Sequence, residues 1–243
     1  MSFLYHAINF KYNIPPSYGL AYDNYFWKKI EMQKYTDSCK VLTDYVDDET
    51  NWFYYHDADH RWTHLKDCWE TTKEKYFEYL KEKNVVVTAG GHVGLYVRFY
   101  SKIFKRVYAF EPNPESFHCM VNNAATENVV KIQAALGESN GLVKMEGWCP
   151  MSLQAKVGHE DAFIPTFTID SLSLNDCSLI QLDVENYEYN ALLGAENTIQ
   201  KYHPVIILEN GDTQEITNLL TGLNYKKVDR VQYDDIWIYD EKA

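Results

Sequence analysis

Residues 84–94 read Asn-Val-Val-Val-Thr-Ala-Gly-Gly-His-Val-Gly, and this stretch decides the fold. The apolar run ending at Thr88 is typical of a short buried strand, and residues 95–103 place Leu, Phe and Ile on one helical face. The turn between them consists of Gly90, Gly91, His92, Val93 and Gly94. Glycines let the backbone approach a ligand closely, and unpaired amides at a helix start face that ligand. The stretch therefore predicts a strand, a nucleotide-binding turn and a helix.

A second strand is expected at residues 106–110, and Glu111 follows it, 21 residues after Gly90. An acidic side chain at this point can accept two hydrogen bonds from the hydroxyls of a ribose. Pro112 comes next, and Asn113 is well placed to cap a helix that has Pro114 at its first position. We expect residues 111–113 to contact the cofactor.

Two ligands fit such a turn, NAD and S-adenosyl-L-methionine. The dinucleotide motif requires a glycine where Ala89 stands, because that glycine makes the tight turn beside a pyrophosphate. Residues 225–231 and 236–239 predict a closing hairpin, which suits a sheet with a reversed last strand better than an all-parallel dinucleotide domain. No second half-domain remains to hold a nicotinamide. These features favour S-adenosyl-L-methionine, with NAD and a purely structural packing turn as alternatives.

From residue 84 onward, short apolar runs alternate with helical patterns, which indicates an α/β fold. Further strands are expected at 128–135, 142–146, 178–183 and 204–209, whereas 146–165 lacks a period and reads as a lid or a surface loop. We predict a Rossmann-like, seven-stranded, mostly parallel sheet with a C-terminal antiparallel hairpin. Residues 1–80 hold 11 of the 20 tyrosines and four of the six tryptophans. We therefore divide the chain into an N-terminal helical aromatic cap, 1–82, and a Rossmann-like domain, 83–243.

The formal net charge of −12 argues against partners that require a basic surface, such as nucleic acid or an anionic membrane. A small neutral or cationic ligand, a description that a small-molecule or glycan acceptor fits, is the easier partner. The five cysteines form no CxxC pair, and no apolar run approaches the roughly 20 residues that span a bilayer. The N-terminus lacks the pattern of a signal peptide, so we expect a cytoplasmic location.

Several ordered motifs resemble the FkbM-type methyltransferases, which are class I enzymes that use S-adenosyl-L-methionine. The matching segments are residues 90–96, 108–113, 134–137, 168–172, 179–188 and 193–195. The resemblance covers about half of the chain, from Asn84 to Glu209, and it adds Thr88 and Ala135 to the expected cofactor contacts. It implies O-methylation, often of a sugar or a related hydroxyl.

Methyl transfer requires an aligned acceptor oxygen and a group that takes its proton. Asp183 and Glu185 lie two residues apart after a buried strand, and Glu188 follows at a helix start. We predict that Asp183 orients the methionine or acceptor end and that Glu185 serves as base or acceptor contact, with Glu188 as a third catalytic candidate. The alternative is a helix-capping cluster, because acids favour helix starts regardless of catalysis.

Metal binding is the other chemistry that these acids permit. Asp170 and Glu209 could join Asp183 or Glu185 around a divalent cation, but the spacing does not demand it, and we predict no metal. His56, His60 and His64 recur every four residues, yet their acidic, aromatic surroundings favour a substrate-facing or structural segment over a metal site.

The chain departs from the family pattern at three positions. Thr88 stands where an aspartate is usual, Gln181 where a lysine is common, and Asn186 where a glycine follows the Asp-Val-Glu sequence. Asparagine tolerates a left-handed backbone better than most residues, so that exchange is mild. Because Thr88 lacks the charge of the usual aspartate, a module that binds the cofactor without catalysing transfer is an alternative.

Overall fold

The structure, a computed structural model, describes residues 40–41, 52–53, 74–146, 156–157 and 162–242. The three histidines of residues 56–64 and most of the predicted N-terminal cap lie outside these ranges. The first two of these ranges are short strands, β1 (Lys40–Val41) and β2 (Trp52–Phe53), which pair antiparallel. Among the described residues, no helix has the length and apolar character needed to cross a bilayer.

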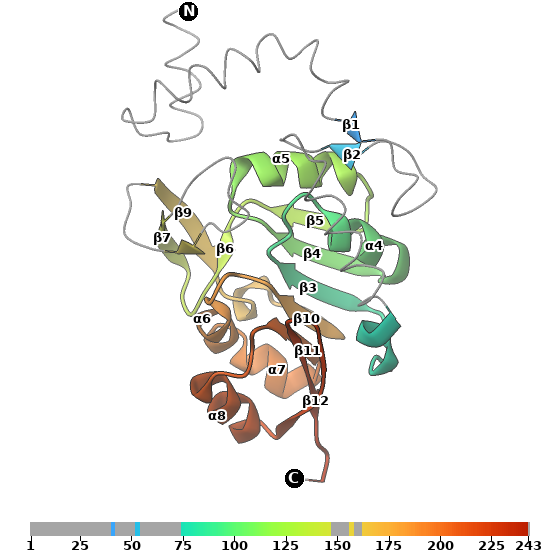
Figure 1. The fold of residues 1–243 in the computed structure, drawn as a ribbon, viewed down its shortest axis with the longest axis vertical. Helices are drawn as coiled ribbons and strands as arrows, with labels where there is room; N and C mark the ends of the chain where they lie inside the picture. The colour runs from blue at the N-terminus through green and yellow to red at the C-terminus, as the bar shows by residue number, and fades with distance from the viewer. Residues whose placement is uncertain (1–39, 42–51, 54–73, 147–155, 158–161, 243) are drawn as a thin grey trace, which may run out of the picture.

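A seven-stranded sheet forms the centre of the fold, in the order β12-β13-β11-β10-β3-β4-β5 (Figure 1). Five strands are parallel, and the last two form an antiparallel hairpin whose strand β13 pairs with β11. Their bounds are β3 (Val85–Ala89), β4 (Arg106–Phe110), β5 (Val129–Ile132), β10 (Leu179–Leu182), β11 (Val205–Glu209), β12 (Tyr225–Val231) and β13 (Asp234–Tyr239). The predicted fold class and the closing hairpin are confirmed.

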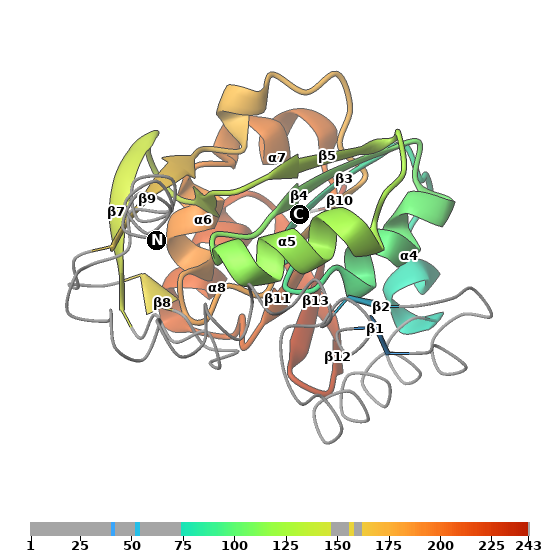
Figure 2. The same cartoon turned by 90° about the horizontal axis from the view of Figure 1, so that it is seen from above.

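Helices cover both faces of this sheet, as Figure 2 shows from above. On one face lie α4 (Leu95–Ile103) and α5 (Pro114–Asn123); on the other lie α6 (Glu188–Leu193), α7 (Glu196–Tyr202) and α8 (Gln214–Gly222). The central strands are covered on both sides, which is why β3, β10 and β11 are nearly continuous apolar runs.

A second, smaller sheet is the main difference from the sequence-based expectation. It has the order β6-β9-β7-β8, with β6 (Ala135–Leu136), β7 (Gly141–Glu146), β8 (Lys156–Val157) and β9 (Ala162–Phe167). The expected strand 128–135 is thus divided between two sheets. The end of the supposed loop 146–165 is a strand that pairs antiparallel with β7.

A short helical segment at residues 74–78 packs against the α4 face of the large sheet. Tyr76 is buried there and stacks on Tyr96 of α4, with 5.9 Å between ring centroids. The described part of the chain therefore enters the core several residues before β3 begins.

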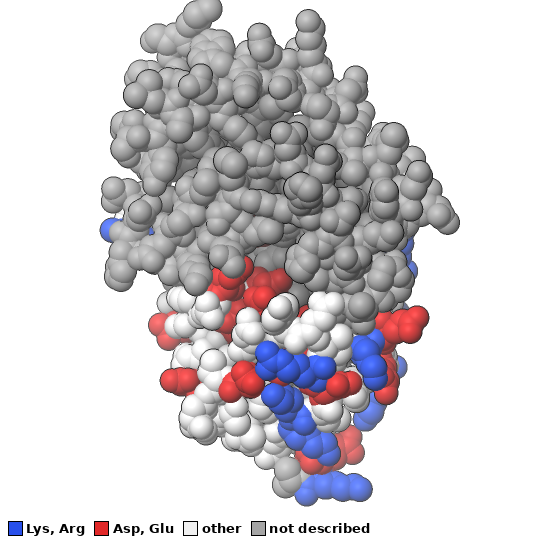
Figure 3. Space-filling view, in the orientation of Figure 1, with Lys and Arg blue, Asp and Glu red and all other residues white. Residues whose placement is uncertain are grey.

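The β12–β13 edge of the sheet carries a network of ion pairs. The buried carboxyl of Asp235 accepts hydrogen bonds from Lys227 (3.1 Å) and Arg230 (3.5 Å), and Arg230 also contacts Asp212 at 3.0 Å. On the face seen in Figure 3, basic and acidic side chains accordingly alternate over the end of the molecule formed by β12 and α8. Asp235 pairs in register with Leu208 of β11, so this network lies directly beside the carboxyl end of β11.

Candidate active site

The glycine turn after β3 is built around close backbone contacts. A Cβ at Gly90 would lie 1.9 Å from the carbonyl oxygen of Asp183, and Gly90 has a left-handed backbone with φ of 80°. The Gly91 N–H donates to the Phe110 carbonyl at 2.9 Å, so the turn is also tied to the end of β4. Only glycine fits at position 90, because any side chain would collide with the strand that carries the predicted catalytic acids.

Glu111 is held at the end of β4 by two backbone donors. Its Oε2 accepts from the His92 N–H at 2.6 Å and its Oε1 accepts from the Asn113 N–H at 2.8 Å. The side chain is only 7% exposed, and burial raises its pKa to about 7 although both backbone hydrogen bonds oppose the shift. The carboxylate therefore links the glycine turn to the start of α5, in the position expected of a ribose acceptor.

The neighbouring cofactor candidates adopt the expected local structure. Asn113 Oδ1 accepts from the Ser116 N–H at 3.2 Å, and α5 begins at Pro114 as predicted. Ala135 opens β6, close after the carboxyl end of β5, and is buried. These positions surround the same edge of the sheet as the glycine turn.

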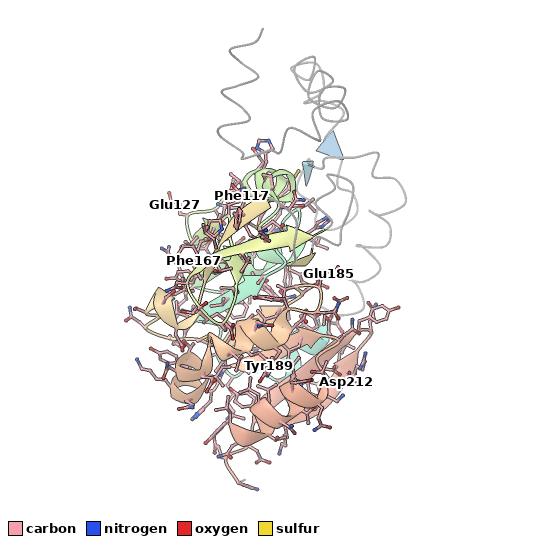
Figure 4. All side chains as sticks on the ribbon, turned by 90° about the vertical axis from the view of Figure 1, so that its left-hand side faces the viewer. Phe117, Glu127, Phe167, Glu185, Tyr189 and Asp212 are labelled. Carbon is pink, nitrogen blue, oxygen red and sulfur yellow. The ribbon has the colours of Figure 1, made fainter. Side chains whose placement is uncertain are left out.

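Three carboxyl groups meet at the ends of β10 and β11. Oxygens of Asp183, Glu185 and Glu209 lie within 4.8 Å of one another. Burial of the Asp183 carboxyl, followed by the nearby charges of Glu209, Asp234 and Glu185, raises its pKa well above the usual range. Figure 4 looks onto the side toward which the parallel strands point and labels Glu185 there. The structure thus brings Asp183, Glu185 and Glu209 together, as the strand order requires.

Two contributors to this acidic group were not predicted. Asp234, the first residue of β13, pairs in register with Glu209, and burial raises its pKa to about 6. The Tyr76 hydroxyl donates to Asp234 Oδ2. The sequence interpretation assigned residues 232–235 to a hairpin turn, so no local pattern identified Asp234 as part of the strand edge.

The carboxylates of Glu188 and Asp170 accept hydrogen bonds from backbone N–H groups. Glu188 Oε1 accepts from the Val184 N–H at 3.0 Å, which favours the helix-capping alternative for this residue. Asp170 begins a short 3-10 helix, Asp170–Leu172, and accepts from the backbone N–H groups of Asn197 (3.1 Å) and Thr198 (2.8 Å) in the first turn of α7 and from both of their side chains. The hypothesis that Asp170 joins Asp183 or Glu185 around a cation is therefore wrong, since the described acids that meet are Asp183, Glu185 and Glu209, and the Asp170 oxygens cap α7.

The positions that depart from the family pattern have clear local roles. Asn186 has φ of 72°, the left-handed conformation that asparagine tolerates, and Glu185 before it has φ of 55°. Thr88 and Gln181 face each other across β3 and β10, and the Thr88 hydroxyl donates to Gln181 Oε1. Thr88 thus directs its hydroxyl to a neighbouring strand.

Comparison with known proteins agrees with this architecture. Residues 89–227 match the model of the methyltransferase FkbM domain, which is more than half of the chain. The chain belongs to the FkbM methyltransferase family. The resemblance inferred from the sequence motifs is confirmed, and membership in this family implies S-adenosyl-L-methionine as the cofactor.

Proteins similar to this chain include a curated methyltransferase and a solved FkbM structure. The hexuronic acid methyltransferase AglP of Haloferax volcanii is 27% identical over 157 residues, which cover 59% of this chain and 64% of that protein. The chain therefore spans less than two thirds of that relative's length. The crystal structure of methyltransferase FkbM from Methylobacillus flagellatus KT aligns with a TM-score of 0.50 at 18% identity, covering 67% of this chain and 46% of that one. This structural similarity concerns the fold alone.

Proposed function

We propose that this chain is an S-adenosyl-L-methionine-dependent O-methyltransferase that acts on a hydroxyl of a sugar-like or other small acceptor. The observation that carries the proposal is the contact between the Gly90 turn and Asp183, which sets a cofactor loop against a group of carboxylates. Family membership argues against the NAD-dependent alternative. The curated relative, whose name specifies a hexuronic acid, supports a sugar-like acceptor.

The residues at this edge suit the cofactor. The missing Cβ of Gly90 lets the turn lie against the Asp183 carbonyl, and Glu111 supplies an oriented carboxylate for a ribose. The proposed cofactor contacts are Gly90, Gly91, His92, Gly94, Glu111, Pro112, Asn113, Ala135 and Asp183. When bound, the cofactor supplies an electrophilic methyl group.

Asp183 and Glu185 have different roles in this proposal. Asp183 lies against the glycine turn and orients the methionine or acceptor end, and Glu185 accepts the proton of the acceptor hydroxyl. A base works best when its pKa lies near the working pH, and burial raises the pKa of the neighbouring Asp183 carboxyl above its usual range. Glu209 adds to this effect through its charge.

Transfer of an isotopically labelled methyl group tests the proposal. Candidate glycans and hydroxylated metabolites would be incubated with labelled S-adenosyl-L-methionine, and mass spectrometry would identify the labelled product. Asp183→Asn and Glu185→Gln should each reduce the rate at least about 100-fold with an unchanged circular dichroism spectrum. The matched control is Glu127→Gln, an exposed acid far along the chain from the acidic group, which should leave the rate unchanged.

Two results would contradict this assignment. Absence of cofactor binding at millimolar concentration in calorimetric titration would remove the cofactor from the proposal. Cofactor binding without transfer to any acceptor, together with unaltered binding by both acid variants, would instead favour a non-catalytic binding module.

A further inference from the structure

A buried polar pair joins the two strands that carry the glycine turn and the catalytic candidates. Thr88 of β3 and Gln181 of β10 are partners in the parallel register, and their exposed fractions are 1% and 3%. The Thr88 hydroxyl donates to the side-chain oxygen of Gln181. The preceding residues on the same face, Val86 and Leu179, are fully buried and apolar. An oxygen left without its partner at this depth would be costly, so each residue holds the other in place.

The position of this pair along the strands gives it a consequence for the site. Gly90 comes two residues after Thr88, just beyond the end of β3, and Asp183 comes two residues after Gln181, just beyond the end of β10. These two residues are in contact: a Cβ on Gly90 would lie 1.9 Å from the Asp183 carbonyl oxygen, and the Asp183 N–H donates to the Ala89 carbonyl at 3.1 Å. The side-chain link therefore sits one pleat before the point where turn and acid meet.

We propose that Thr88 and Gln181 form a positioning pair that holds the cofactor turn at Gly90 in register with Asp183. The inference rests on the proposed function, and it assigns to Thr88 an action through Gln181 without contact with the cofactor. A neutral pair suits this place, because a single charge among Val86, Leu179 and their neighbours would be buried without compensation. The hydroxyl and the amide oxygen supply a directional link that an apolar contact would not.

Three variants separate positioning from simple packing. Thr88→Val removes the hydroxyl at nearly constant shape and leaves the Gln181 oxygen without a donor, so Tm should fall by about 2–4 °C. Its Kd for S-adenosyl-L-methionine, measured by calorimetry, should rise roughly tenfold, because small displacements of positioned groups have large effects. Thr88→Ser keeps the hydroxyl and should remain close to the wild type in both measurements.

The double variant Thr88→Val/Gln181→Leu provides the decisive comparison. It leaves no unsatisfied polar group, so Tm should return to within about 2 °C of the wild type. The Kd should stay roughly tenfold raised, because the directional link is still missing. Affinity would then be lost without loss of stability.

Other outcomes overturn the inference. If the double variant recovers the wild-type Kd together with Tm, the pair is structural only. An unchanged Kd in Thr88→Val also contradicts positioning. If the wild-type chain itself fails to bind the cofactor, the proposed function falls and this inference falls with it; only in that case is the wild-type titration flat.

Discussion

Replacement of Glu111 by glutamine removes a buried charge whose effect on stability depends on pH. Burial raises the pKa of Glu111 from its ordinary value of 4.5 to about 7. The folded chain therefore holds this proton more tightly than the unfolded chain. Its contribution to stability is fully present below about pH 4.5 and is lost as the pH rises through about 7. The total loss is about 3 kcal/mol, of which about 2.5 kcal/mol falls between pH 5 and pH 8.

Urea unfolding of wild type and Glu111→Gln at pH 5, 6, 7 and 8 measures this effect. The amide cannot accept from both the His92 and the Asn113 N–H, so the variant also loses about 1–3 kcal/mol at every pH. This loss does not vary with pH. The informative quantity is therefore how the difference in unfolding free energy between variant and wild type changes with pH. Relative to the wild type, the variant should gain about 2.5 kcal/mol from pH 5 to pH 8. The exposed control Glu127→Gln should show no such trend.

The same charge should govern cofactor affinity. A ribose donates to the ionised carboxylate, whose fraction falls from about 0.9 at pH 8 to about 0.1 at pH 6 around a pKa of about 7. The wild-type Kd for S-adenosyl-L-methionine should therefore rise about tenfold over this interval, whereas that of Glu111→Gln should be weaker and flat. A stability difference that varies by less than about 0.5 kcal/mol between pH 5 and pH 8 would refute the reasoning.

Four further predictions follow from the site. Gly90→Ala places a Cβ 1.9 Å from the Asp183 carbonyl at φ of 80°, so we expect at least about 2 kcal/mol less stability in urea unfolding and no calorimetric signal with the cofactor; normal binding would contradict the close contact. Asp183→Asn removes a group whose pKa is raised by burial and by Glu209, so the Tm of the variant relative to wild type should increase from pH 5 to pH 8; a decrease would reverse the assigned sign. Asp170→Ala removes the α7 cap and should lower the unfolding free energy by about 1–2 kcal/mol without changing the methyl-transfer rate. A slower rate would indicate that Asp170 contributes to the site. A chelator such as EDTA should leave the transfer rate unchanged, and inhibition reversed by Mg²⁺ would assign a cation to the acidic group.

Much of the large sheet could be predicted because its strands are short apolar runs with clear boundaries. β3, β10 and β11 are buried on both faces, and their sequences show it directly. β9 was not predicted, because Pro165 interrupts its pattern and Phe163 is 48% exposed. A strand in a small, half-covered sheet lacks the alternation that marks a strand over a core.

The site could be predicted where it depends on neighbours in sequence. Glu111 and Asn113 follow β4 directly, and their mutual hydrogen bond needs no distant partner. The link between Thr88 and Gln181 joins residues 93 positions apart and depends on strand register, which single residues do not specify. Asp234 was missed for the same reason, since its pairing with Glu209 depends on where the hairpin turns.

The hydrogen bond from Tyr76 to Asp234 spans 158 positions of the chain and has a practical consequence. A protease that cut between residues 80 and 84 would separate the donor from its acceptor. The fragment that begins after the cut would keep every strand of the large sheet, yet Asp234 would lose its donor and Tyr96 its stacking partner. A shortened chain intended for crystallography or binding assays should therefore retain residues from 74 onward.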